Sequence, residues 1–324
     1  MKWYHLQPED YTVGWVCALP VEFAAAQQML DQEHEDLPRD DSTDTNLYTL
    51  GRMGKHNVVV ACLPAGQTGN NNAAAVAVQM KSKFTSVRFV LMVGIGGGVP
   101  SDSADVRLGD VVISQPGKQY GGVVQYDFGK TTPSGFERTG FLNTPPTVLL
   151  NALSKLQANR VLGRSSLAKY LSSFSGRPVF ARDNAGTDIL FEPTYKHVGG
   201  EKCEMCSQRR WIKRNPRGNQ EIAIHYGTIA SGNQVMRDGV IRDTVSSELG
   251  GVLCFEMEAA GLMNSFPCLV IRGICDYADS HKNKMWQPYA AATAAACAKE
   301  ILSVIPAEEV ATTCTVNEAI DDVR

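Results

Sequence analysis

The chain has 324 residues, 44% of them hydrophobic, and a formal net charge of -3 from 31 basic and 34 acidic residues. The near-neutral charge argues against nucleic acid or an anionic membrane as a partner, and the hydrophobic content suffices for one enzyme-sized core that acts on a small molecule. Nine scattered cysteines and an N-terminus without an apolar signal segment favour a cytoplasmic protein.

Short apolar or β-branched runs alternate with helical patterns along most of the chain. Strands are predicted at residues 12–18, 57–63, 89–93, 110–114, 222–230 and 268–274. Helices are predicted at residues 21–30, 71–83, 256–264 and 287–304. This alternation predicts an α/β fold, with one domain over residues 11–306 and a central mixed, largely parallel sheet flanked by helices.

The segment 129–220 differs from the rest because it is rich in Pro, Gly, Ser and Arg. We expect it to be an insertion over one end of the sheet, with helices at 146–158 and 165–174. Residues 307–324 are polar and acidic, which predicts a C-terminal tail or linker.

A glycine-rich sequence, GIGGGV, occupies residues 94–99 directly after a predicted strand. Glycines let a backbone approach a ligand closely, and Gly96 is therefore a candidate substrate-binding residue. A dinucleotide fingerprint fits poorly, because its third glycine would fall at Val99 and Pro100 follows instead of a helix. A tight loop at the sheet edge is the alternative interpretation.

Two carboxylates, Glu256 and Glu258, stand two residues apart in the sequence FEMEAAG. A carboxylate at the start of a predicted helix either caps the helix or holds the hydroxyl groups of a ligand. Capping is the usual explanation, so the functional interpretation needs support from elsewhere in the chain. Both residues are kept as candidate substrate-binding groups.

Acidic residues also stand at the ends of two predicted strands. Asp276 ends the strand in LVIRGICDYAD, and Glu22 follows the first strand at the head of a helix. Ligands of open α/β sheets bind outside the carboxyl ends of the strands, which makes both side chains candidate catalytic groups. Capping of the following helix is the alternative and suits Asp279 better than Asp276.

The insertion carries a Cys203–Cys206 pair near His197, but two cysteines without a second pair are a weak zinc signal. We therefore assign no metal and no cofactor, and leave open whether these cysteines bind a metal. The sequence from Arg209 and Arg210 to Arg217 is basic, and such runs are more often solvated surfaces than binding sites. Within a loop over the site, Arg209 and Arg210 could instead bind phosphate groups of a substrate.

Seven sequences taken in order resemble those of the nucleoside phosphorylase superfamily: ALPVEF, PAGQTGNNNAA, VGIGGGV, LGDVVIS, IASGNQV, FEMEAAG and LVIRGICDYAD. Within it, the resemblance is closest to the nucleosidases of methylthioadenosine and S-adenosylhomocysteine. It is closer still to the phosphorylase-like N-terminal domains of fungal multidomain proteins similar to immune receptors. Such relatives are usually homo-oligomers, which is the expectation here.

The resemblance implies that Glu22 activates the attacking water and that Asp276 protonates the purine at N7. This division of labour agrees with the chemistry, because a purine anion is a poor leaving group and water is a poor nucleophile. Two acids on opposite sides of one glycosidic bond meet both needs.

The resemblance also implies how the substrate is held. Glu258, together with Met257, holds the ribose hydroxyls, and Arg272 orients the acidic cluster. Val235 and Met236 pack on the base or bond it through the backbone.

The sequence departs from phosphorylases where they place cationic phosphate ligands. Residues 18–21 and 92–95 contain no cation, and Ile95 stands where nucleosidases carry a serine. We therefore rank a purine nucleosidase that hydrolyses adenosine, AMP or ATP first. A phosphate-dependent phosphorylase is the second hypothesis, and an inactive nucleotide-sensing domain is the third.

Overall fold

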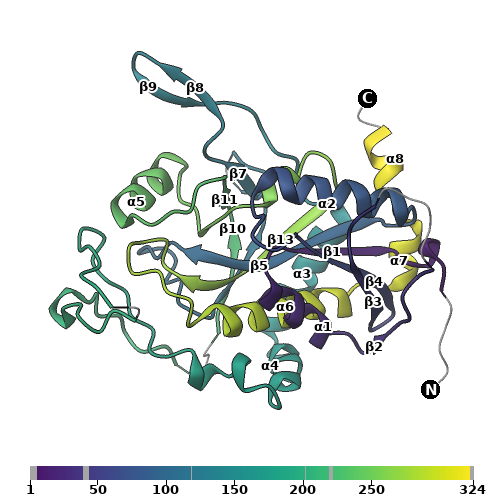
Figure 1. Cartoon of the computed structure of the whole chain (residues 1–324), viewed down its shortest axis with the longest axis horizontal. Coiled ribbons are helices and arrows are strands. Elements are labelled where there is room, and N and C mark those ends of the chain that lie inside the picture. The colour runs from purple at the N-terminus through teal and green to yellow at the C-terminus, as the bar shows by residue number, and fades with distance from the viewer. Residues whose placement is uncertain (1–5, 39–43, 118, 201, 219–221, 322–324) are drawn as a thin grey trace.

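A mixed sheet of eleven strands runs through the middle of the molecule (Figure 1). The computed structural model describes residues 6–38, 44–117, 119–200, 202–218 and 222–321. The strands of the sheet are β1 (Val13–Cys17), β2 (Gln32–Glu33), β3 (Tyr48–Met53), β4 (His56–Cys62), β5 (Phe89–Gly98), β6 (Val111–Ser114), β7 (Val123–Gln125), β10 (Ile224–Gly227), β11 (Ile229–Ser231), β12 (Cys254–Glu256) and β13 (Cys268–Asp276).

The order of the strands brings distant parts of the sequence together. Along the main path it is β10-β6-β13-β5-β1-β4-β3-β2, while β12 pairs with β5, and β11 pairs with β12 and β7. The long central strand β5 is parallel to both β1 and β13. The carboxyl ends of these three strands therefore lie at one edge of the sheet, which is where such sheets bind ligands. The predicted α/β fold with a mixed, largely parallel sheet is confirmed.

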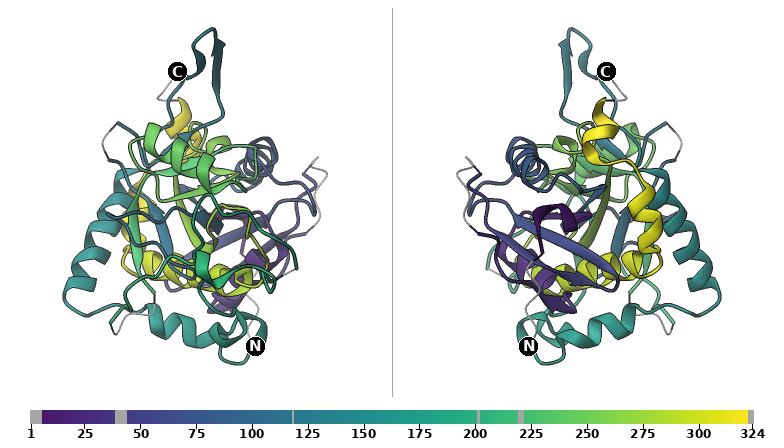
Figure 2. Two further views of the ribbon diagram at one scale, coloured as in Figure 1. Left: turned by 90° about the vertical axis from the view of Figure 1, so that its left-hand side faces the viewer. Right: turned by 90° about the vertical axis from the view of Figure 1, so that its right-hand side faces the viewer.

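Helices cover both faces of the sheet. They are α1 (Pro20–Gln28), α2 (Asn70–Lys83), α3 (Thr147–Val161), α4 (Leu167–Leu171), α5 (Gly239–Glu248), α6 (Gln287–Ser303), α7 (Ala307–Thr312) and α8 (Val316–Asp321). Helix α6 packs on β13 and β5, with α1, α3 and α4 against it, whereas α2 lies over β1 and β4 on the opposite face (Figures 1 and 2).

The sequence of each layer explains this packing. Alternate residues of β1 enter different core clusters: Val13 and Trp15 pack toward α6, and Val16 packs toward α2. Helix α6 is rich in buried alanine, so its backbone comes close to β13. A Cβ atom at Gly273 would overlap the carbonyl oxygen of Ala290, so only glycine fits at this crossing.

Most of the predicted helices and strands are present, but two segments differ from the prediction. The segment 256–264 is not a helix: its first residue closes strand β12, and only a 3-10 turn, η6 (Ala259–Gly261), follows. The backbone of Gly261 lies against Asn70 at the start of α2, and that contact replaces helical continuation. The predicted strand 222–230 is divided into β10 and β11, which pair with β6 and β12 respectively.

The insertion and the C-terminal segment have more structure than polar composition suggests. Residues 129–138 form a protruding hairpin of β8 (Gly129–Thr132) and β9 (Gly135–Arg138), and both predicted helices of the insertion are present as α3 and α4 (Figure 1). The segment after Pro306, expected as a tail or linker, carries α7 and α8. Val310 and Val316 of these helices are buried in the two main core clusters.

Among the described residues, no single helix is both long and apolar enough to cross a membrane. Two consecutive helical segments, Gln287–Ser303 and Ala307–Glu318, would together have the length and apolar composition of a membrane span, but the chain bends by 82° between them.

Candidate active site

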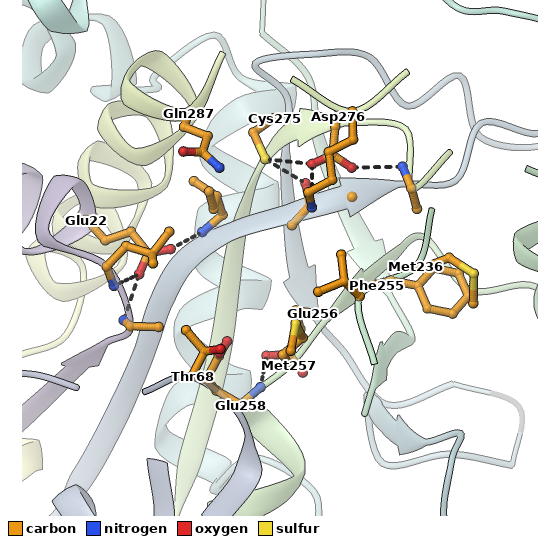
Figure 3. Close-up of a pocket in the computed structure, with 18 of the residues that line it drawn as sticks. Glu22, Thr68, Met236, Phe255, Glu256, Met257, Glu258, Cys275, Asp276 and Gln287 are labelled. Atoms are coloured by element: carbon orange, nitrogen blue, oxygen red, sulfur yellow. Dashed lines mark hydrogen bonds and ion pairs between the residues drawn. The ribbon is translucent and has the colours of Figure 1, made fainter. Parts of the chain in front are cut away.

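A pocket opens at the carboxyl ends of β1, β5 and β13. It encloses about 630 Å³, a volume that includes open solvent at its mouth. Its walls come from segments far apart in the sequence: Ala18, Leu19, Glu22, Thr68, Ile95, Gly96, Gly97, Gln234, Val235, Met236, Phe255, Glu256, Met257, Glu258, Cys275, Asp276, Ala278, Lys282 and Gln287. Figure 3 shows Glu22, Glu258 and Asp276 reaching it from different elements.

Glu22 stands in the first turn of α1, immediately after β1. One carboxylate oxygen accepts hydrogen bonds from the backbone amides of Ala18 (2.7 Å) and Leu19 (2.9 Å), and the other accepts one from Ile95 (2.8 Å). Burial raises the pKa of Glu22 above its usual value, against the lowering effect of Arg272 and these amides. The group is a fixed carboxyl with raised basicity, which suits a general base.

The glycine-rich run belongs to strand β5 and is not a loop. Its glycines leave room for the acidic groups: a Cβ atom at Gly97 would come within 2.7 Å of the Asp276 carboxylate, and one at Gly96 within 3.1 Å of the Phe255 carbonyl oxygen. Gly96, a candidate substrate-binding residue, lines the pocket. The run allows a strand to pass directly beside the carboxylates.

Gly94 provides a test of this close packing. A Cβ atom there would lie 2.5 Å from an Arg272 nitrogen and 2.6 Å from a Glu22 oxygen, and both side chains are buried. We expect Gly94→Ala to destabilise the fold by about 1–3 kcal/mol, as overpacking of a core does. Gly54→Ala is the comparison, because Gly54 has open space around it. The positive φ of Gly54 adds a backbone cost to this variant. Denaturant unfolding measures both, and an unchanged stability in Gly94→Ala would refute the packing described.

Arg272 lies fully buried beneath the pocket floor on β13. Its guanidinium contacts the carboxylates of Glu256 and, at 3.3 Å, Glu258. Burial disfavours its charge, but Glu256, Glu258 and Glu22 outweigh burial and raise its pKa above the ordinary value. Arg272 is therefore a permanent cation in contact with two of the acidic side chains.

The neighbouring acids Glu256 and Glu258 have different surroundings. Glu256 accepts hydrogen bonds from the amides of Glu258 and Ala259, so it caps the turn η6 and pairs with Arg272. The capping interpretation therefore applies to Glu256. Glu256 also lines the pocket, but its oxygens already have partners.

Glu258 faces the start of helix α2. The amide of Gly69, the residue before the helix, donates to its carboxylate at 3.3 Å, and Thr68 lines the same wall. Burial raises the pKa of Glu258 to about 7, although Arg272 acts to lower it. A carboxyl with few partners at a helix N-terminus can accept hydrogen bonds from ligand hydroxyl groups.

Asp276 ends β13 on another wall of the pocket. One oxygen accepts a hydrogen bond from the amide of Ala278 (2.9 Å), and the other lies 2.9 Å from the ammonium of Lys282. Lys282 lines the pocket, and the sequence analysis did not identify it. Lys282 follows Asp276 by only six residues, in the turn that leaves the strand. This short spacing is the sequence feature that could have identified it.

The remaining wall is apolar. The candidate residues Val235 and Met236 line it, and Phe255 lies beside Met236 (Figure 3). Phe255 is 5% exposed and packs edge-on against Tyr126. A flat aromatic or heterocyclic group fits against such a wall. Phe255 was missed because an aromatic residue inside a strand reads as core.

Arg209 and Arg210 are not brought to this pocket. They lie in the 3-10 turn η5 (Gln208–Arg210), where Arg210 pairs with Glu192 at 2.8 Å and approaches the ring of Tyr195. Neither lines the pocket. Among the described residues that do line it, Lys282 is the only cation.

Comparisons with known proteins agree with this architecture. The family model described as "Phosphorylase superfamily" matches residues 12–305. A nucleotide-binding leucine-rich repeat (NLR)-like protein of Hyaloscypha variabilis is 48% identical over 302 residues, which is 93% of this chain and 30% of that protein. The ATP nucleosidase Cap17 of Escherichia coli is 25% identical and covers 86% of this chain. The chain spans 48% of Cap17, so both relatives are much longer.

Solved structures show the same fold. The 5'-methylthionadenosine/S-adenosylhomocysteine nucleosidase of S. pneumoniae, solved with a transition-state inhibitor, superposes with a TM-score of 0.58 at 18% identity. The match covers 91% of this chain and all of that one.

Proposed function

Because the chain belongs to the phosphorylase superfamily, we propose that it is a purine nucleosidase that cleaves the N-glycosidic bond of an adenine nucleoside or nucleotide with water. The observation that carries the proposal is the meeting of Glu22, Glu258 and Asp276 in one pocket. The names of Cap17 and of the structurally similar nucleosidase support the same reaction class.

The positions of the acids divide the work between them. Asp276 donates a proton to the departing purine, and Glu22 accepts one from the attacking water. The ammonium of Lys282 lies 2.9 Å from an oxygen of Asp276 and positions this group. Glu258 accepts hydrogen bonds from the ribose hydroxyls, and the wall of Val235, Met236 and Phe255 holds the base.

The choice of water over phosphate rests on the cations. Phosphate binding needs cationic donors, and the only cation among the described lining residues is Lys282, which is paired with Asp276. Arg272 lies beneath the floor and is occupied by Glu256 and Glu258. Water needs no such donors and is the acceptor that the pocket favours.

A panel of adenosine, AMP, ATP, methylthioadenosine, inosine and guanosine tests the proposal by chromatography of released base. We expect adenine from at least one adenine compound, and slower release from inosine and guanosine. The compound that releases base fastest is the substrate. A nucleotide would be preferred over a nucleoside only if residues beyond the pocket wall contact its phosphate groups. Absence of base release from every compound would instead favour the inactive sensing domain.

The pKa of Glu258 makes ribose binding depend on pH. With a pKa of about 7, Glu258 is a neutral acid below that pH and a carboxylate above it. The carboxylate is the stronger acceptor for hydroxyl groups. The Kd of an uncleavable C-nucleoside analogue of adenosine should therefore fall as pH rises through about 7 and then level off.

Two controls isolate Glu258 in this titration. Glu258→Gln should bind the analogue with little pH dependence, and the 2',3'-dideoxy analogue should bind the unmodified protein in the same way. Calorimetric titration measures each Kd. A pH dependence that survives in both controls would show that another group is responsible.

A further inference from the structure

Three side chains of the insertion converge outside the active-site pocket. His197, Cys203 and Cys206 place one potential ligand atom each within 4.8 Å of one another. The Nδ1 atom of His197 lies 3.5 Å from the sulfur of Cys203 and 3.4 Å from that of Cys206. Bond lengths of about 2.3 Å to sulfur and 2.1 Å to nitrogen in a tetrahedron separate such atoms by about 3.6 Å. The observed spacing matches a zinc site.

The backbone around these residues prepares them for a metal. Nε2 of His197 lies 2.9 Å from the carbonyl oxygen of Gly200, which requires a proton on Nε2 and leaves the lone pair of Nδ1 directed at the sulfurs. The amide of Cys206 donates to the carbonyl of Cys203 at 3.0 Å, which forms the tight turn typical of paired cysteine ligands. Cys203 has a φ of +62°, a strained value for a residue other than glycine.

A second imidazole lies beside this cluster. His281 is 8% exposed, and neither of its ring nitrogens has a hydrogen-bond partner among the described residues. Its ring centroid is 5.7 Å from that of His197, and its carbonyl oxygen is 3.8 Å from the sulfur of Cys203. The carboxylate of Asp279 lies 3.6 Å from its Nδ1 atom. A buried imidazole in this state has a nitrogen available for a metal.

We propose that His197, Cys203 and Cys206 bind one zinc ion. Three protein ligands hold the ion and leave a fourth tetrahedral position open. All three belong to the insertion. His281, beside them, follows Asp276 by five residues on the segment that also carries Lys282. Phe191 of the insertion stacks on His281 with ring centroids 3.9 Å apart, so the ion would order the part of the insertion that packs on the active-site wall.

The metal content of the full-length chain, purified without a metal-affinity step, tests the proposal. Inductively coupled plasma mass spectrometry should find about one zinc ion per chain. Cys203→Ser, Cys206→Ser and His197→Ala should lose most of it, because each removes one of the three ligand atoms. Cys314→Ser is the matched control, because Cys314 is exposed and distant in sequence, and it should keep its zinc.

Cobalt substitution provides a readout that is independent of activity and of variant stability. Exchange of Co²⁺ into the unmodified protein should give thiolate-to-cobalt charge-transfer absorption. A protein that contains no zinc and takes up neither Zn²⁺ nor Co²⁺ would overturn the proposal. A Cys203–Cys206 disulfide found by mass spectrometry in freshly purified, metal-free protein would also overturn it, in favour of a redox pair.

Discussion

Replacing Asp276 with asparagine is expected to slow base release by about 10²- to 10⁴-fold, the usual contribution of a general acid. Asparagine has nearly the shape of aspartate and can still accept the hydrogen bond from the amide of Ala278, which is 2.9 Å long. It has no acidic proton to transfer to the purine. The substitution therefore removes proton donation while it keeps the wall of the pocket.

Asp102→Asn makes the same chemical change on an exposed turn and serves as the control. Turnover is followed by chromatography of the free base, and thermal unfolding checks that both variants fold. Near-full activity in Asp276→Asn would remove this residue from the role of acid. A large fall in thermal stability would show instead that the ion pair with Lys282 is needed for folding.

Replacing Glu22 with glutamine should reduce turnover by a similar factor of about 10²–10⁴, because an amide cannot accept the proton of the attacking water. The structure adds a cost that the sequence alone did not show. Both oxygens of Glu22 accept backbone amides, and glutamine offers only one oxygen, so one amide faces an NH₂ group. The variant should also lose about 1–3 kcal/mol of folding stability.

These two effects are separated by measuring binding as well as turnover. Folded Glu22→Gln should bind an uncleavable adenosine analogue with a Kd close to that of the unmodified protein, because the proposed role of Glu22 is toward the attacking water and not toward the base. Glu248→Gln, on an exposed position of α5, is the control. Loss of analogue binding in stable, folded Glu22→Gln would mean that Glu22 shapes the pocket and is not the base.

The sheet was predictable because its central strands are buried on both faces. Strands such as β1 and β13 are largely apolar runs bounded by turn residues, and this pattern can be recognised in the sequence alone. The edge strand β2, its neighbour β3 and helix α5 were missed, since their mixed polar sequences acquire structure from their neighbours. The extension of β5 through its glycines was missed because glycine normally interrupts strands.

The site was predictable where a carboxylate follows a buried strand, as Glu22 and Asp276 do. Lys282, Thr68 and Phe255 were missed, because they join the pocket from turns or strand interiors whose orientation depends on the fold. The prediction for Arg209 and Arg210 rests on their charge, and charge does not fix where an insertion places its side chains. A homo-oligomer and a cytoplasmic location stay predictions.

The most direct test of hydrolysis is the dependence of base release on phosphate, measured with the best substrate of the panel in buffer freed of phosphate by an enzymatic scavenger. We predict an unchanged rate when phosphate is added, with free ribose, or its 5'-phosphorylated form if the substrate is a nucleotide, as the sugar product. A rate that rises with phosphate, together with formation of ribose 1-phosphate, would contradict the account and make the protein a phosphorylase.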